Sequence, residues 1–308
     1  ILFLFSFFWT YVMPWLQICI HTTPEHVPTF EDTLLECGAM VVTFEDVYDN
    51  PVYEPDLNTT PLWQHTKVTG LFEADADIES IRPIIEHTAQ TLGQQELSLK
   101  IEILEDKDWE REWMDSYHPI QFGERLWVCP SWREVPDENA VTLMLDPGLA
   151  FGTGTHPTTA LCLQWLDSID CQDKSIIDYG CGSGILGIAG LLLGADKMVG
   201  IDIDPQAVQA TQANAERNNI DPSRIEVKLP PYESELQADI VVANILAGPL
   251  AQLAPTISAL VKTGGQLALS GILANQAKEV VEAYQEWFTL ESIVEIEDWV
   301  RIVGTKHA

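Results

Sequence analysis

Basic residues are scarce in this sequence of 308 residues. Sixteen Lys and Arg face 47 Asp and Glu, which gives a formal net charge of -31. So large an excess of negative charge repels the phosphates of nucleic acids and attracts cationic partners. We therefore expect a basic partner and no direct nucleic-acid substrate; the alternative is that the acidity serves solubility alone.

Paired cysteines are also lacking. The six cysteines are scattered and form no C-x-x-C motif, which argues against a zinc site and against a disulfide framework. Free thiols are typical of the reducing cytosol. The sequence therefore predicts a cytoplasmic protein without a bound metal.

Charge is absent from the first 20 residues, which are long enough to span a membrane. A signal peptide would need a basic start and a small-residue cleavage site, and neither is present. Our hypothesis is that Met13 is the biological start and that residues 1–12 are an apolar extension that is not native. A genuine membrane anchor is the alternative, and otherwise we expect no membrane association.

The length of the chain favours two domains. In residues 13–105 the apolar pattern predicts the order β-α-β-β-α-β, which is the ferredoxin-like arrangement of a small α+β domain. The predicted strands are 15–21, 39–47, 67–73 and 98–105, and the predicted helices are 25–37 and 77–92. Residues 13–99 hold 15 acidic and two basic residues, a net charge of -13. This part shows no catalytic constellation, so we expect it to bind a partner or to support the structure.

Residues 106–120 read as a linker, with a charged, aromatic helix over 106–118, and residues 121–308 as a larger α/β domain. Two β segments at 124–130 and 140–146 open it. Strands and helices then alternate, which predicts a parallel sheet covered by helices on both faces. The expected strands are 175–179, 198–203, 225–229, 239–243 and 265–270, and the expected helices are 185–194, 205–218, 248–261 and 275–287. Segments 290–297 and 299–305 are too closely connected to be parallel, so the sheet should end in an antiparallel strand pair.

The strongest motif is a glycine-rich turn that follows the strand at 175–179. Asp178 precedes Gly180, Gly182 and Gly184, after which a helix begins. Glycines let the backbone pass close to a ligand, and the first turn of a helix has free N–H groups. Asp202 ends the next strand, where an acidic side chain can hold the two hydroxyls of a ribose. The combination predicts a nucleotide site rather than a tight loop alone.

The glycine turn does not by itself identify the nucleotide. Residues 182–187 satisfy G-x-G-x-x-G, so an NAD-dependent dehydrogenase is a rival interpretation. After Gly187, however, the only histidine is His307, and hydride transfer would lack an obvious acid–base partner. Asp178, directly before the glycines, instead resembles the acid–glycine signature of S-adenosylmethionine enzymes.

Asn244 lies at the expected carboxyl end of the strand at 239–243, the edge at which such sheets hold ligands. Enzymes that methylate amino groups often carry an Asn-Pro-Pro-aromatic loop there, whereas this chain has Asn244-Ile-Leu-Ala. Without the aromatic ring a flipped base has no stacking surface, which favours an amine that does not belong to a base. The alternative is that Asn244 only caps a helix.

A polar loop precedes the helix expected near Pro157. Residues 145–159 read LDPGLAFGTGTHPTT, with three glycines, four threonines and His156. Such a stretch is costly to bury without hydrogen-bond partners, and binding over a cofactor is its natural use. For His156 alone, loop packing and a functional role are equally open.

These segments together resemble the ribosomal protein methyltransferase family known as PrmA. The resemblance rests on DPGLAFGTGTHPTT, IIDYGCGSGILGIA, GIDIDPQAV and VVANILAGPL, and with EDKDWEREWMDSYHP it extends from Met13 to the C-terminus. It implies a Rossmann-like methyltransferase that uses S-adenosylmethionine to methylate lysine side chains and the N-terminal amine of large-subunit ribosomal protein eleven, free or during assembly.

The resemblance also implies roles for individual residues. Thr159, Gly180, Asp202 and Asn244 match positions that contact the cofactor, and Phe151 matches a loop residue near its methionine end. Gly182, Gly184 and Asp178 belong to the same glycine turn. Asn244 is the expected orienter of the target amine, and no general base stands out. The acidic first domain matches the substrate-recognition module of the family.

Two further interpretations stay open at this point. One is a methyltransferase that acts on a nucleic-acid base or a small molecule. The other is a dehydrogenase or a nucleotide-binding module without catalysis.

Overall fold

The computed structural model describes residues 15–48, 62–94, 96–104, 117–137, 139–146, 154–231, 235–291 and 293–308. The chain divides into two compact units, unit 1 (Ile1–Asp115) and unit 2 (Ser116–Ala308). The apolar extension at 1–12, residues 106–116 of the expected linker helix and Phe151 fall outside the described residues, and residues 117 and 118 are not helical.

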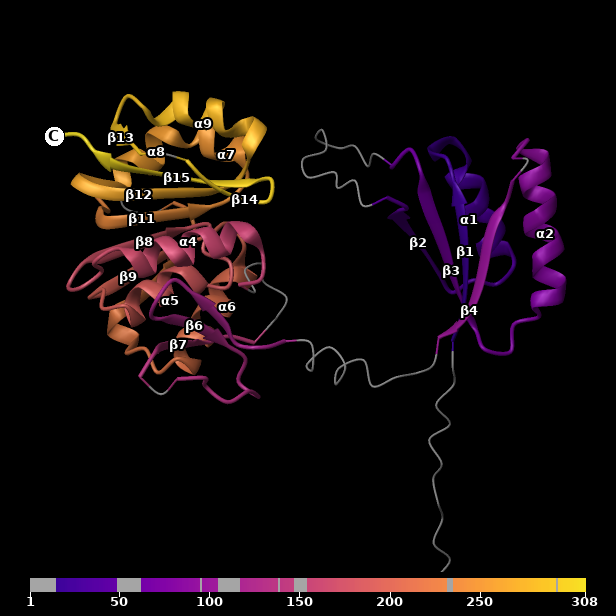
Figure 1. Ribbon diagram of the computed structural model, residues 1–308, viewed down its shortest axis with the longest axis horizontal. Helices are drawn as coiled ribbons and strands as arrows, with labels where there is room; N and C mark the ends of the chain where they lie inside the picture. Colours follow the sequence, from indigo (N-terminus) through magenta and orange to yellow (C-terminus); the bar gives the residue numbers. More distant parts are fainter. Residues whose placement is uncertain are drawn as a thin grey trace, which may run out of the picture. The chain divides into compact units, whose positions relative to one another are not determined.

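Unit 1 has the element order expected from its sequence (Figure 1). The elements are β1 (Trp15–Thr22), η1 (Pro24–His26), α1 (Val27–Glu36), β2 (Val41–Asp46), β3 (Thr66–Glu73), α2 (Ile78–Thr91) and β4 (Ser98–Leu104). The four strands form one antiparallel sheet in the order β2-β3-β1-β4. Side chains from β1 and β3 pack against α1 and α2 in a core that contains Ile18, Phe30, Val68 and Ile85. Alternate residues of each strand point to opposite faces, so this one-sided packing explains the alternating pattern of the sequence.

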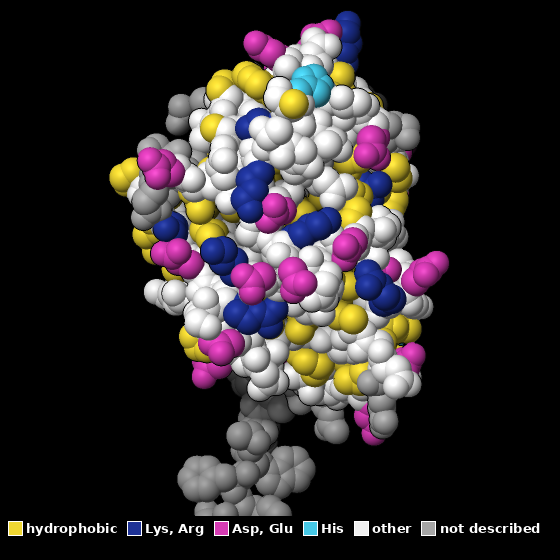
Figure 2. Space-filling view, turned by 90° about the vertical axis from the view of Figure 1, so that its left-hand side faces the viewer, with side chains coloured by type: hydrophobic (Ala, Val, Ile, Leu, Met, Phe, Trp, Pro, Cys, Tyr) yellow, Lys and Arg dark blue, Asp and Glu magenta, His cyan; other side chains and the backbone are white. Residues whose placement is uncertain are grey.

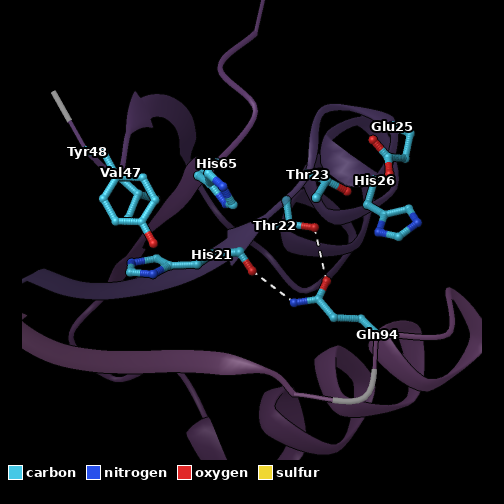
Figure 3. A pocket seen from close by; sticks show the side chains of 9 residues that line it. All are labelled: His21, Thr22, Thr23, Glu25, His26, Val47, Tyr48, His65 and Gln94. Carbon is cyan, nitrogen blue, oxygen red and sulfur yellow. Dashed lines mark hydrogen bonds between the residues drawn. The ribbon is translucent and has the colours of Figure 1, made fainter. Parts of the chain in front are cut away.

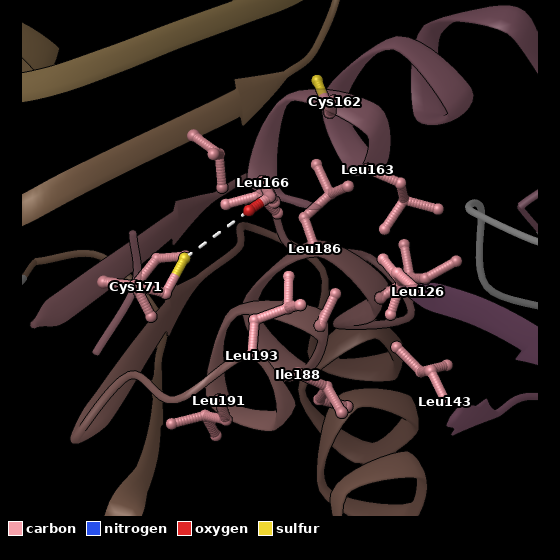
Figure 4. Packing of buried hydrophobic residues seen from close by; sticks show 14 of the residues in the cluster. Leu126, Leu143, Cys162, Leu163, Leu166, Cys171, Leu186, Ile188, Leu191 and Leu193 are labelled. Carbon is pink, nitrogen blue, oxygen red and sulfur yellow. Dashed lines mark hydrogen bonds between the residues drawn. The ribbon is translucent and has the colours of Figure 1, made fainter. Parts of the chain in front are cut away.

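Unit 2 begins with a three-stranded sheet, of which one strand was not expected from the sequence. β5 (Ile120–Phe122) pairs antiparallel with β6 (Leu126–Cys129), and β6 pairs in parallel with β7 (Val141–Met144). With only three residues, β5 is too short to leave a periodic signal in the sequence. Leu126 and Leu143 from this sheet join the main core of unit 2 (Figure 4).

The main sheet of unit 2 is Rossmann-like, with mostly parallel strands, as the sequence predicted. Its order is β10-β9-β8-β11-β12-β15-β13, and β14 pairs with β15. β8 to β12 run parallel, whereas β15 is antiparallel to its neighbours. The strands are β8 (Ser175–Tyr179), β9 (Lys197–Ile201), β10 (Ile225–Lys228), β11 (Ala238–Asn244), β12 (Val261–Leu273), β13 (Phe288–Leu290), β14 (Val294–Ile296) and β15 (Trp299–Lys306).

Helices cover both faces of this sheet (Figure 1). They are α4 (Pro157–Ser168), α5 (Ile185–Leu192), α6 (Pro205–Arg217), η2 (Pro222–Arg224), α7 (Ala247–Gln252), α8 (Ala254–Leu260), η3 (Ala274–Gln276) and α9 (Ala277–Tyr284). Ile176 and Val242 pack with α4 and α5 in one cluster, while Ile177 and Val241 pack with α7 to α9 in another. Neighbouring residues of a strand thus enter different cores, which is why these strands are continuously apolar in the sequence.

Three predicted elements differ in detail from the structure. The helix expected at 248–261 is two helices, α7 and α8, because Pro255 has no N–H with which to continue the first and instead lies in the first turn of the second. The strand expected at 265–270 is longer and forms β12. The segment 290–297 contributes to two short strands, β13 and β14, whose register against β15 differs by one residue, as a β-bulge produces.

Candidate active site

The carboxyl ends of β8, β9 and β11 form the edge at which the predicted site residues gather. β8 lies at the centre of the parallel strands, with β9 on one side and β11 on the other. Connections leave such a central strand in opposite directions, and a crevice opens where they diverge. Asp178 lies near the end of β8, Asp202 follows β9, and Asn244 is the last residue of β11.

The turn between β8 and α5 requires its glycines. Gly180, Gly182 and Gly184 have φ angles of +74°, +53° and +77°, values that strain residues with a β-carbon. The amide N–H of Gly180 donates to the carbonyl of Ile201 over 2.7 Å, which holds the turn against the end of β9. A β-carbon at Gly180 would in addition overlap the side chain of Ile245, the residue after Asn244. The turn therefore approaches both neighbouring strand ends closely.

Helix α6 fixes the same turn from the other side. The Thr211 hydroxyl donates to the carbonyl of Gly182 over 3.0 Å, and the Asn214 amide donates to the carbonyl of Ser183 over 2.8 Å. Thr211 is fully buried, and Asn214 nearly so. The sequence does not reveal these two residues, because nothing in a helix of ordinary composition indicates a contact with a turn about 30 residues earlier.

The Asp202 carboxylate is held by backbone amides on both oxygens. Gly182 donates its N–H to one oxygen over 2.9 Å, and Asp204 donates to the other over 3.0 Å. The next side chain, Ile203, is 85% exposed, although an apolar residue of this size is usually buried. An oriented carboxylate beside an open apolar side chain suits a nucleoside, which combines hydroxyls with an apolar ring. Ile203 was also missed from the sequence, because its exposure is a tertiary property.

Asp178 is enclosed by the protein, with a side chain only 1% exposed. Burial raises its pKa to about 7; the Gly187 N–H, which donates over 2.9 Å, opposes the shift, and the charge of Asp202 adds to it. The hydrogen bond joins the end of β8 to the first turn of α5, so Asp178 supports the geometry of the glycine turn.

Asn244 is connected to the helix of the preceding polar loop. Its side-chain Nδ2 donates to Thr159 Oγ1 over 3.3 Å, and Thr159 is fully buried in α4. Asn244 Oδ1 is buried and has no hydrogen-bond partner in the described structure. A buried amide oxygen without a partner is costly, so a ligand that donates a hydrogen bond there would remove the penalty.

His156 caps the helix that carries Thr159. Its Nδ1 accepts the N–H of Thr158 over 3.3 Å and lies 2.8 Å from the Thr158 hydroxyl. The imidazole also contacts Trp299 edge to face, with ring centroids 4.9 Å apart. Burial lowers the pKa of His156, with a smaller opposing effect from Glu297, which favours the neutral ring that the cap needs. The geometry thus favours loop packing over proton transfer for His156.

The site fits a nucleoside-containing cofactor such as S-adenosylmethionine. The turn at 180–184 has the positive φ angles that glycine adopts without strain, the Asp202 carboxylate is oriented, and the oxygen of Asn244 lacks a donor among the described residues. The described residues contain no group of three or more His, Cys, Asp or Glu side chains arranged to hold a metal ion. None of the helices described here combines the length and apolarity needed to cross a membrane.

Unit 1 contains a polar pocket of about 370 Å³ (Figure 3). It lies where β1 and β2 end and β3 begins, and it is lined by His21, Thr22, Thr23, Glu25, His26, Val47, Tyr48, His65 and Gln94. Gln94 fixes one side, since it accepts a hydrogen bond from Thr22 and donates one to the carbonyl of His21. The pKa of Glu25 is lowered by a hydrogen bond from the backbone N–H of Glu25 itself and, to a smaller extent, by the Thr23 hydroxyl. This carboxylate is therefore charged at neutral pH.

Comparison with known proteins gives a consistent result along almost the whole chain. Residues 14–307 match the family model described as ribosomal protein L11 methyltransferase (PrmA). A protein of Marinomonas sp. (strain MWYL1) named ribosomal protein L11 methyltransferase is 86% identical over 296 residues, which are 96% of this chain and 100% of that protein. A protein of the same name from Escherichia coli O8 (strain IAI1) is 59% identical over 297 residues, again 96% of this chain and 100% of the relative.

A solved structure is also similar. The ribosomal protein L11 methylase from Lactobacillus delbrueckii subsp. bulgaricus matches with a TM-score of 0.56 and 30% identity, covering 62% of this chain and 100% of that one.

Proposed function

The chain belongs to the ribosomal protein L11 methyltransferase (PrmA) family, and from this premise we propose which residues bind, orient and recruit. The protein is a methyltransferase with S-adenosylmethionine as its methyl donor and ribosomal protein L11 as its substrate. We further propose that the acceptors are amino groups, namely lysine side chains and the N-terminal amine.

In this proposal the carboxyl edge of the main sheet holds the methyl donor. Asp202 binds the ribose hydroxyls, and Gly180, Gly182 and Gly184 let the backbone approach the bound molecule. Thr159 and the buried Asp178 hold the surrounding loops in place. The fixed orientation of the Asp202 carboxylate supports this assignment, because a backbone N–H holds each of its two oxygens. We also assign Phe151 to this site from the motif alone.

The proposal depends above all on the buried Asn244 oxygen without a hydrogen-bond partner. An amine with at least one N–H can donate to that oxygen, while Thr159 keeps the amide from rotating. When bound, S-adenosylmethionine would supply a methyl group on a positively charged sulfur. The neutral amine would form a bond to the methyl carbon while the carbon–sulfur bond breaks, and the sulfur would leave as a neutral thioether. Asn244 then orients the amine. A lysine amine must first lose a proton, since its unperturbed pKa is about 10.4, and a low-polarity site lowers that pKa.

The distribution of charge in unit 2 supports a cationic substrate at this edge. Five basic residues lie at the opposite edge of the main sheet, where its parallel strands begin and β15 ends: Lys174, Lys197, Arg224, Lys262 and Lys306. On that side Lys and Arg are interspersed with Asp and Glu (Figure 2). The accessible carboxylates of Asp202 and Asp204 lie at the carboxyl edge, together with Lys228 at the end of β10. We propose that these two carboxylates attract the basic substrate toward Asn244.

We assign residues 13–105 to substrate recognition, 106–120 to a linker and 121–308 to catalysis. The two units have separate cores, which is consistent with separate tasks. The pocket of unit 1 is lined by the charged Glu25 and, toward its other end, by the ring of Tyr48, which is 65% exposed (Figure 3). An ammonium or guanidinium group can pair with Glu25, and a ring such as that of Tyr48 attracts the same kind of cation. We therefore propose that this pocket receives a basic side chain of the substrate.

Replacement of Glu25 tests the pocket. Glu25→Gln should raise the KM for the ribosomal protein several-fold and leave both kcat and the affinity for S-adenosylmethionine unchanged, because the site of methyl transfer is not altered. Glu86→Gln is the matched control, since Glu86 is exposed on α2 and its replacement removes the same charge. Equal effects of the two variants would show that only the overall charge matters.

We propose that the enzyme acts in the cytoplasm on the protein when free or during ribosome assembly, without a nucleic-acid substrate and without a membrane. The test is methyl transfer from labelled S-adenosylmethionine to purified ribosomal protein L11, to ribosomal RNA and to complete large subunits. Label on the free protein alone is the expected result. Label on RNA would contradict the proposed substrate class, and equal label on complete subunits would contradict the requirement for a free or assembling substrate.

A further inference from the structure

Ile245, the residue after Asn244, lies between two glycines that are far apart in the sequence. On one side is Gly180 of the turn after β8, where an added β-carbon would overlap Ile245 Cγ2. On the other side is Gly271 of β12, where an added β-carbon would overlap the carbonyl oxygen of Ile245 and lie 2.7 Å from its carbonyl carbon and 3.1 Å from its nitrogen. The contact with Gly271 therefore involves the backbone of Ile245, which cannot move away as a side chain could.

The backbone of β12 changes course at this point. Asn244 pairs with Ser270 in the last register position between β11 and β12. The register of β12 against β15 shifts between Leu269 and Ile272, and Gly271 has a φ angle of +84°. Such an irregularity bends a strand and redirects the residues next to it. A glycine inside a strand often marks the close approach of another backbone, and here that backbone is the peptide that follows Asn244.

The neighbouring residues hold the bend in place. Ser270 is fully buried, and its hydroxyl donates to the carbonyl of Val300 over 3.0 Å. The Asn244 side chain is anchored by Thr159, but the direction of its Cα–Cβ bond depends on the backbone at 244–245. A contact that fixes the peptide of Ile245 therefore also fixes where Asn244 Oδ1 points.

We propose that Gly271 is a positioning residue for methyl transfer. Because Gly271 has no side chain, the backbone of β12 can contact the peptide of Ile245 closely. This contact sets the orientation of the Asn244 amide toward the acceptor amine. This inference rests on the role proposed above for Asn244 and identifies β12 as the strand that holds Asn244 in position. An error of about 1 Å in the position of a reacting group can cost about a hundredfold in rate, so the loss of this contact should act on kcat.

Gly271→Ala tests the proposal, with Gly264→Ala as its matched control. Gly264 lies in the same strand with a φ angle of +73°, and an added β-carbon there meets nothing within 4 Å. Both variants carry the same kind of backbone strain, but only the first displaces Ile245. We expect kcat for methylation of ribosomal protein L11 to fall about a hundredfold in Gly271→Ala and to change little in Gly264→Ala, with S-adenosylmethionine affinity affected far less than kcat.

Asn244→Ala, alone and combined with Gly271→Ala, distinguishes positioning from a general structural effect. If Gly271 acts through Asn244, its replacement costs no further kcat once the amide is gone. Additive losses, or a Gly271→Ala variant that behaves like Gly264→Ala while Asn244→Ala is impaired, would overturn this inference alone. An unchanged kcat of Asn244→Ala would overturn the proposed role of Asn244 as well.

Ser270→Ala provides a second variant in case Gly271→Ala does not fold. It removes the hydroxyl that holds the bend of β12 against the carbonyl of Val300, and it strains no backbone. The expected result is again a loss of kcat that exceeds the loss of S-adenosylmethionine affinity. Unchanged kcat would show that the bend of β12 does not position Asn244 and would overturn the inference.

Discussion

Asp178 and Asp202 are two carboxylic acids at neighbouring strand ends with different environments. Asp202 is half-buried, and each of its oxygens accepts a backbone N–H, so the orientation of its carboxylate is fixed. Asp178 is fully enclosed, and burial raises its pKa to about 7. The first is suited to hold a ligand, and the second supports the turn at a cost in stability that depends on pH.

Asp178→Asn should stabilise unit 2 more at high pH than at low pH. The pKa of Asp178 is raised from 3.8 to about 7 in the folded state, so the folded protein binds the proton more tightly than the unfolded chain. The contribution of Asp178 to the free energy of unfolding is fully present below pH 3.8 and is lost as the pH rises toward 7. Asparagine carries no charge and still accepts the Gly187 N–H. Thermal unfolding should therefore show a difference in Tm between variant and parent that is small at pH 5 and grows by about 5 °C at pH 8. A difference independent of pH would contradict the buried-acid interpretation.

Asp202→Ala should weaken binding of S-adenosylmethionine without unfolding the protein. The loss of hydrogen bonds to a charged group costs about 1.5–3 kcal/mol, or roughly tenfold to a hundredfold in Kd. Calorimetric titration measures this change. Asp204→Ala is the control, because Asp204 caps α6 by accepting the N–H of Gln206 and its loss should lower stability by about 1 kcal/mol with little effect on affinity. The assignment of Asp202 would be wrong if both variants bound equally well.

At the scale of elements, α4 connects the polar loop to the site. His156 caps its N-terminus, Thr159 in its first turn accepts from Asn244, and the carbonyl of Leu161 accepts a hydrogen bond from Arg301 of β15. Helix α4 therefore contacts both the end of β11, through Thr159, and the antiparallel strand β15, through Leu161.

His156→Ala should destabilise unit 2 by about 1 kcal/mol, as is usual for the loss of an N-cap. Burial lowers the pKa of His156 below 6.5, so the neutral cap contributes fully above pH 6.5, and its contribution is lost as the pH falls through the folded pKa. The Tm difference from the parent should accordingly be larger at pH 8 than at pH 5. His118→Ala serves as the control, because His118 is exposed. A deficit that grows toward low pH would refute the role of a neutral cap.

At the scale of the whole molecule, the net charge of -31 governs encounters with other macromolecules. Long-range attraction of a basic substrate is screened by salt, since the Debye length falls from about 10 Å at 0.1 M to about 3 Å at 1 M. We expect the KM for the ribosomal protein to rise several-fold between 0.05 and 0.5 M salt, because charge steering acts on association. Steady-state kinetics should show little change in kcat. A KM that is insensitive to salt would indicate that the acidity serves solubility alone.

The sequence by itself determined the features that depend on neighbouring residues. Asp178, the three glycines of the turn and Asp202 are close together in the chain, and their spacing follows from one strand-turn-helix-strand unit. The parallel sheet and its antiparallel ending follow from the length and spacing of apolar segments for the same reason. The short strand β5 and the separation of α7 from α8 at Pro255 also depend on neighbouring residues. Their sequence patterns are weaker than the apolar periodicity around them, so they were not predicted.

Only the tertiary structure decided what surrounds these residues. Thr211 and Asn214 support the glycine turn from α6, and Gly271 presses on Ile245 from β12, although none of them belongs to a motif. Some of these contacts join segments about 30 residues apart, and others join neighbouring strands. All of them depend on the bend and register of a complete sheet. A glycine in a strand has the same sequence signature whether or not a backbone lies against it, as the open surroundings of Gly264 and the closed surroundings of Gly271 illustrate. The candidate site residues could thus be proposed from the sequence, whereas the residues that hold them in place required the fold.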